Sequence, residues 1–102
     1  MTEQLDFILE NGKLTVNTDL QAGREDELRQ VCGELLDSGE KNLFVDLSSV
    51  KYIHSLSIGM LSYTWVEALS RDKDVSFLVS REVADILERT GLAKVFAYEV
   101  TD

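Results

Sequence analysis

The stretch NLFVDLSSVKYIHSLSIGMLSYTW, residues 42–65, decides the fold of this chain. It opens with a short apolar run, 42–47, between polar residues, which is typical of a buried parallel strand. A polar loop follows, and an apolar helical pattern then runs from about 56 to 70. A strand that passes through a short loop into a helix is the building unit of an α/β sheet.

Upstream of this stretch, the dipeptide Asn11-Gly12 predicts a β-hairpin. Both residues tolerate positive φ, which the tightest hairpin turns require. The flanking segments, about 5–10 and 13–17, alternate in the way expected of two antiparallel strands.

Two further helices are expected from apolar spacing and from capping residues. In the downstream helix, Ser80 is the expected N-cap, and Thr90-Gly91 is the expected stop. In the upstream helix, Gly39 is the expected stop. The apolar face of that upstream helix follows the spacing i, i+3, i+4, i+7 and i+8, at Leu28, Val31, Cys32, Leu35 and Leu36.

Two more strands, 75–79 and 95–100, complete the pattern. The expected order is β-β-α-β-α-β-α-β. Strands that alternate with helices imply right-handed crossovers. We therefore predict an α/β fold, a mixed and mostly parallel sheet with an N-terminal β-hairpin and helices packed on it.

Composition limits the classes of function. The 102 residues suit one domain, 1–102, and 44% hydrophobic with 28% charged residues is an ordinary globular balance. A net charge of −9 argues against nucleic acid and anionic lipid as partners. A single cysteine, Cys32, on an apolar helix face, excludes an internal disulfide and predicts an inert core thiol.

Targeting and cofactor signals are missing from the sequence. The start, MTEQLDF, has no signal-peptide pattern, and no apolar run approaches the roughly 20 residues of a membrane span. No nucleotide-binding motif or metal-ligand cluster is present. We expect a cytoplasmic protein without membrane insertion, cofactor, metal or small-molecule substrate.

The loop at 47–55 is the strongest candidate site, since functional loops in such sheets follow the carboxyl ends of strands. Ser55 can act as the N-cap of the next helix, or it can accept a phosphate, which the positive end of a helix dipole tolerates. The two roles are compatible. Asp46, at the strand end, either supports this loop or simply caps backbone N–H groups.

The helix after the loop carries two apolar stripes, although one is enough to bury it on a sheet. One stripe consists of Ile58, Leu61, Trp65, Ala68 and Leu69. The other consists of Leu56, Met60 and Tyr63 and is extended by Glu67. Either a neighbouring element covers this second stripe, or it is a partner surface with an aromatic anchor.

The pair His54-Ser55 invites a hydrolase interpretation, which the sequence does not support. The chain has no second histidine, and IHSLSIG is not a G-x-S-x-G nucleophile elbow. Sequence neighbours also seldom point at each other with catalytic geometry. We expect no catalytic residue and regard His54 as an exposed loop residue.

Two motifs resemble those of the STAS domains of bacterial anti-sigma factor antagonists. The family segment, approximately D-L-S-x-V-x-x-I/M-D-S-S/T-G-L-G-x-L, is matched by Asp46-Leu47-Ser48, Val50, Ile53, Ser55, Ile58-Gly59 and Leu61. A later pattern, L-x-x-T-G-L-x-x-V/L-F, is matched by Leu87, Thr90, Gly91, Leu92, Val95 and Phe96. The resemblance implies a STAS fold over nearly the whole chain.

The resemblance also implies a non-enzymatic protein-binding switch in a partner-switching pathway. An unphosphorylated antagonist binds a kinase that is also the anti-sigma factor, serine phosphorylation releases it, and a phosphatase resets it. The matching phosphoacceptor is Ser55, with Ser57 as the second choice. The expected partner-binding residues are His54, Leu56, Ser57, Met60 and Tyr63.

Three positions depart from the family pattern. His54 replaces the usual acidic residue, Leu56 replaces Ser or Thr, and Ser57 replaces the first glycine. Some STAS domains are not phosphorylated and serve as subunits of other assemblies. The alternative is therefore a constitutive STAS subunit or scaffold of a transport or signalling assembly, in which Ser55 is only a cap. A small-ligand or nucleotide sensor at the same loop is a third interpretation.

Overall fold

The computed structural model describes residues 5–101. Residues 1–4 and 102, which include most of the acidic start and both ends of the expected domain, lie outside the described residues. The elements in chain order are β1 (Phe7–Glu10), β2 (Lys13–Val16), α1 (Glu25–Leu36), β3 (Asn42–Leu47), α2 (Ser55–Ser70), β4 (Asp74–Val79), α3 (Arg81–Arg89) and β5 (Glu99–Val100).

The five strands form one mixed sheet in the order β1-β2-β3-β4-β5. β1 and β2 are antiparallel, and the other neighbouring pairs are parallel. The hairpin turns at Asn11 and Gly12, which have φ of 52° and 78°. The predicted α/β class, element order and mostly parallel sheet are confirmed.

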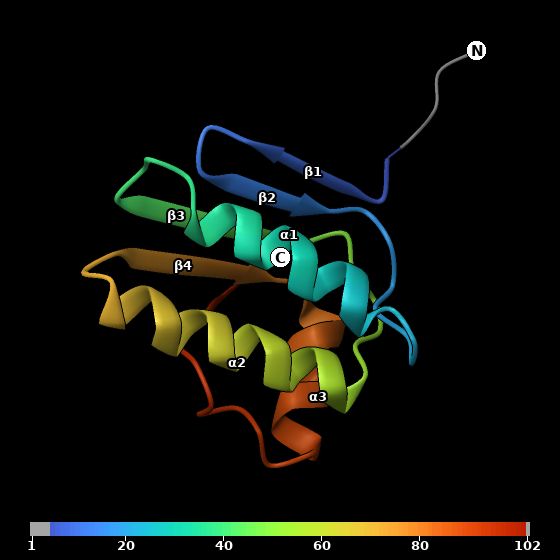
Figure 1. Cartoon of the computed structure of the whole chain (residues 1–102). Helices are drawn as coiled ribbons and strands as arrows, with labels where there is room; N and C mark the ends of the chain where they lie inside the picture. Colours follow the sequence, from blue (N-terminus) through green and yellow to red (C-terminus); the bar gives the residue numbers. More distant parts are fainter. Residues whose placement is uncertain (1–4, 102) are drawn as a thin grey trace.

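The core lies between the sheet and its helices. Leu14, Val45 and Phe77 are direct neighbours across β2, β3 and β4, and all three are buried. Figure 1 shows α1 and α2 side by side over the sheet. The same hydrophobic cluster takes in residues of all three helices, among them Leu28, Leu61 and Leu87.

The end of α1 differs from the expectation. The helix ends at Leu36 with Asp37 as C-cap, and Gly39 does not adopt the positive φ of a glycine stop. Arg71, just after α2, donates to the carbonyl of Leu36 at 3.3 Å and to the carboxylate of Asp37 at 2.9 Å. A side chain from another element thus satisfies a carbonyl at this helix end, and Gly39 is not the C-terminal stop.

The last strand is much shorter than the predicted 95–100. Only Glu99 and Val100 pair with β4. Phe96 is instead buried, with its ring centroid 4.5 Å from that of Phe77. The apolar character that suggested a strand serves core packing, because packing overrides local β-propensity.

Both expected signals for α3 are confirmed. The hydroxyl of Ser80 accepts the N–H of Val83 at 3.1 Å, so Ser80 is the N-cap. Thr90 is the C-cap, and Gly91 follows it with φ of 77°.

Candidate functional site

The loop between β3 and α2 is anchored to three other parts of the chain. Leu20 forms an isolated parallel bridge with Ile53, through the bonds Leu20 N–H to Tyr52 carbonyl (2.9 Å) and His54 N–H to Leu20 carbonyl (2.7 Å). Asp46 accepts the N–H of Ser48 at 2.9 Å, which ties the loop to the end of β3.

Two more contacts hold the middle of the loop. The carboxylate of Asp19 accepts the N–H of Lys51 at 2.9 Å. The hydroxyl of Ser80, at the start of α3, donates to the carbonyl of Val50. With backbone groups bound from several sides, this loop presents the start of α2 in one defined position.

His54, rather than Ser55, is the N-cap of α2. Its backbone is extended (φ −77°, ψ 151°), and its Nδ1 accepts the N–H of Leu56 at 3.1 Å. The N–H groups of Ser57 and Ile58 bond to the carbonyl of His54. The expectation that Ser55 caps the helix is therefore wrong: imidazole supplies the acceptor one residue earlier, and the helix begins at Ser55 itself.

Because His54 supplies the cap, the side chain of Ser55 takes no part in capping, and it is exposed. Within residues 5–101, no hydrogen bond engages its hydroxyl. The first turn of α2 contains no acidic residue, so no nearby carboxylate of the helix opposes an added anion. A phosphate on this hydroxyl would lie at the positive end of a 16-residue helix.

Ser57 has the opposite environment. Its side chain is 0% exposed, and its hydroxyl has no hydrogen-bond partner in the described part of the chain. It lies on the inward side of α2 next to buried Ile58. The expectation that Ser57 contacts a partner is wrong for this conformation, and a kinase could reach it only after α2 opens.

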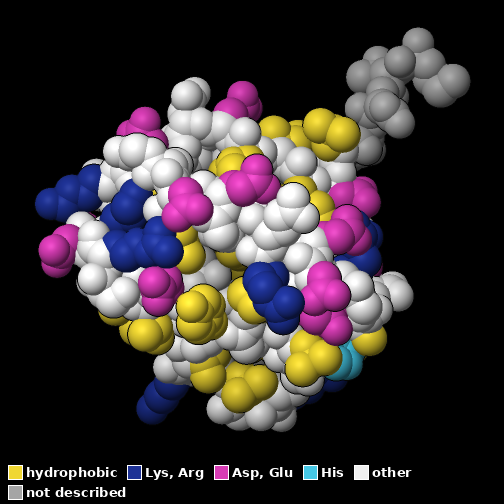
Figure 2. All heavy atoms as spheres, viewed as in Figure 1, with side chains coloured by type: hydrophobic (Ala, Val, Ile, Leu, Met, Phe, Trp, Pro, Cys, Tyr) yellow, Lys and Arg dark blue, Asp and Glu magenta, His cyan; other side chains and the backbone are white. Residues whose placement is uncertain are grey.

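The second stripe of α2 is partly exposed. Leu56 and Tyr63 are 57% and 59% exposed, whereas Met60 is half-buried and lines a hollow between α1 and α2. Two further exposed residues extend it, Val66 and Leu69. Leu56, Tyr63, Val66 and Leu69 form the exposed apolar face of α2, and Figure 2 shows hydrophobic side chains gathered over this helix.

Two residues of this face are not among the partner-binding residues expected from the sequence. Leu69 was expected on the buried stripe, but only Ile58, Leu61 and Ala68 of that stripe are buried, with Trp65 half-buried. Val66 was not singled out. It lies three residues after Tyr63, a spacing that makes the two side chains neighbours on the helix surface.

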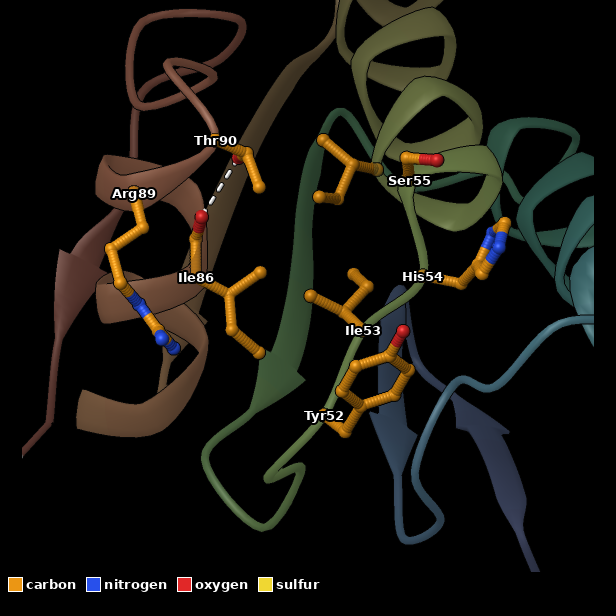
Figure 3. A pocket seen from close by; sticks show the side chains of 8 residues that line it. Tyr52, Ile53, His54, Ser55, Ile86, Arg89 and Thr90 are labelled. Atoms are coloured by element: carbon orange, nitrogen blue, oxygen red, sulfur yellow. Dashed lines mark hydrogen bonds between the residues drawn. The ribbon is translucent and has the colours of Figure 1, made fainter.

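A hollow of about 360 Å³ separates the start of α2 from the end of α3. Figure 3 shows Ile53 and Ile86 facing one another across it, while the ring of His54 turns away from α3. Arg89 also lines the hollow. Ser55 thus lies where this hollow and the exposed apolar face of α2 meet.

Three further observations concern a reactive thiol, a metal site and a membrane span. Burial raises the pKa of the Cys32 thiol to about 11, which leaves it protonated and unreactive at neutral pH. Residues 5–101 contain no group of three or more His, Cys, Asp or Glu side chains arranged to hold a metal. None of the helices in that range is long and apolar enough to cross a membrane.

A comparison with known families identifies the family to which this chain belongs. The family model described as "Mlab, STAS domain" matches residues 3–98. The chain belongs to this STAS domain family. No curated protein sequence matches it.

Two solved structures share this fold. The NMR structure of the Thermotoga maritima protein TM1081 is 19% identical, with a TM-score of 0.70, over 99% of this chain and 85% of that one. The crystal structure of the same protein, described as a candidate anti-sigma factor antagonist, gives a TM-score of 0.66 at 19% identity, over 94% and 84% of the two chains. At this level of identity, the likeness establishes the fold.

Proposed function

We propose that this STAS domain is a phosphorylation-controlled binding module of the anti-sigma factor antagonist type. The observation that carries the proposal is the position of Ser55. Its exposed and unbonded hydroxyl lies at the first residue of α2, next to the exposed apolar Leu56. A modification there acts directly on any partner that covers this helix.

The unphosphorylated form binds its partner through the start of α2. Leu56 and Tyr63 supply exposed apolar and aromatic anchors, and half-buried Met60 adapts to the partner's shape. His54 contributes the edge of the contact. The occupant of this surface is a serine kinase that is also an anti-sigma factor, and the domain performs no catalysis.

Phosphorylation of Ser55 releases the partner. A phosphate adds a charge of about −1.5 to −2. Desolvating it inside an apolar interface costs several kcal/mol unless a cation pairs with it. Because each ~1.4 kcal/mol changes affinity tenfold, one phosphate is enough to switch binding off, and a phosphatase restores it.

A second candidate is a constitutive STAS subunit of a transport or signalling assembly. It is favoured by His54, which occupies the position of the usual acidic residue, and by the matching family model, which is named for Mlab. In this case the exposed apolar face of α2 is a permanent interface, and Ser55 is not modified.

The two candidates are separated by incubating the protein with ATP and a purified anti-sigma factor kinase of the same organism, followed by mass spectrometry. The switch predicts phosphate on Ser55 in the wild type and none in Ser55→Ala. A protein that binds such a kinase and yet stays unmodified supports the constitutive subunit.

A matched pair of variants tests what the phosphate does. Ser55→Asp should weaken kinase binding strongly, whereas Ser55→Ala should bind like the wild type. Equal binding by the two variants contradicts the charge mechanism.

A further inference from the structure

The cap of α2 depends on a side chain that can take up a proton. Nδ1 of His54 accepts the N–H of Leu56 at 3.1 Å. A ring nitrogen accepts only while it carries no proton, so this bond requires the neutral imidazole with its hydrogen on Nε2. The cap of α3, the hydroxyl of Ser80, has no such requirement.

A protonated His54 would have charges of both signs around it, because the first turn of α1 carries Glu25, Asp26 and Glu27, and Figure 2 shows acidic side chains close to the histidine. It would stand at the positive end of the α2 dipole, and the first turn of α2 has no acidic side chain. Arg89 and Tyr52 line the hollow on the α3 side, but the ring of His54 turns away from α3. On the other side, the neighbours in the hollow are the uncharged Gln21 and Ala22.

Two carboxylates of the neighbouring segment accept backbone N–H bonds and keep their negative charge. Asp19 accepts the N–H of Lys51, and Glu25, at the start of α1, accepts the N–H of Gly23 at 2.8 Å. No carboxylate lines either of the two hollows beside the ring. Protonation removes the cap, and no carboxylate of residues 5–101 forms an ion pair with the ring in this conformation.

We propose that His54 makes the start of the α2 binding surface sensitive to pH. The cap is intact while Nδ1 carries no proton and is lost when acid places a proton on it. Leu56 is both the residue whose N–H is capped and a member of the exposed apolar face. Loss of the cap frays the turn that carries this anchor.

The cap proposal does not require that Ser55 is phosphorylated. The effect of the cap on partner affinity rests on the proposed function, because it assumes that the partner covers Leu56. A weaker first turn must be ordered on binding, and this lowers affinity. We thus expect the partner to bind less tightly in mild acid.

Ring and amide NMR of the wild-type protein tests the cap without any partner. At neutral pH, ring ¹⁵N shifts should show the Nε2–H tautomer. Acidification to about pH 5 should reduce the hydrogen-exchange protection of Leu56 roughly 5-fold, as expected for loss of one cap, and leave that of Val83 unchanged. An Nδ1–H tautomer at neutral pH, or parallel behaviour of the two amides, overturns the proposal.

Two variants complete the experiment. His54→Asn keeps an uncharged acceptor at the cap position, and so it should retain protection of Leu56 at every pH; His54→Ala should lose it at every pH. A His54→Asn protein with the wild-type pH dependence overturns the role of His54. If the wild-type cap titrates but affinity for the kinase does not, the cap proposal stands and the docking site of the proposed function fails.

Discussion

The hydroxyl of Ser80 donates to the carbonyl of Val50 and so joins the start of α3 to the site loop. The same oxygen accepts the N–H of Val83, and Ser80 is only 4% exposed. One buried side chain therefore caps a helix and fixes the loop that leads to α2. This double role makes the position of Ser55 depend on a residue 25 positions away.

Ser80→Ala is expected to lower the free energy of unfolding by about 1–3 kcal/mol. The variant loses a helix cap and leaves the carbonyl of Val50 without its bond. Urea denaturation followed by circular dichroism measures the change. Ser70→Ala is the control, since that exposed hydroxyl only bonds back to its own helix, and a loss there as large as at Ser80 contradicts the double role.

Ser57→Ala is expected to leave stability unchanged or raise it by up to about 1 kcal/mol. The hydroxyl of Ser57 is buried without a hydrogen-bond partner, and alanine removes this uncompensated polar group. Thermal unfolding measures the effect. A clear loss of stability would show that the hydroxyl has a partner, such as a bound water. The variant should still be phosphorylated at Ser55, which separates the two serines.

Leu56→Asp and Tyr63→Ala are each expected to weaken binding of the proposed kinase at least tenfold. Both remove an exposed apolar anchor, while exposed substitutions usually change stability by less than about 0.5 kcal/mol. Calorimetric titration measures the affinity. Val100→Ser, on the edge strand β5, is the matched exposed control and should bind normally. Normal binding by both α2 variants would place the interface elsewhere.

Stability is expected to fall above about pH 9 because of Cys32. Burial raises the pKa of its thiol from 9.0 to about 11. The protonated thiol is favoured in the folded state, so this contribution is fully present below pH 9 and is lost as pH rises towards 11. The slope of unfolding free energy against pH should be smaller in Cys32→Ala. Equal slopes in the two proteins would contradict a buried thiol.

Local patterns predicted much of the fold. Asn11-Gly12 specified a hairpin because both residues adopt positive φ, and Ser80 and Gly91 marked the two ends of α3 through capping. These signals act between near neighbours, so they can be identified without the rest of the chain. Long-range packing decided the exceptions. Phe96 left its expected strand to pack on Phe77, and Arg71 bonded the end of α1.

The candidate site shows the same division. The sequence by itself placed Ser55 in a polar loop at the mouth of an apolar helix and identified Leu56 and Tyr63 as a surplus stripe. Only the tertiary structure decided that Ser57 is buried and that Val66 and Leu69 are exposed, because burial depends on which side of α2 meets the sheet and α1. The tertiary structure also decided that His54 is the N-cap of α2. The hydrogen bond from the N–H of His54 to the carbonyl of Leu20 fixes the backbone of the loop, and from this position the imidazole reaches the N–H of Leu56.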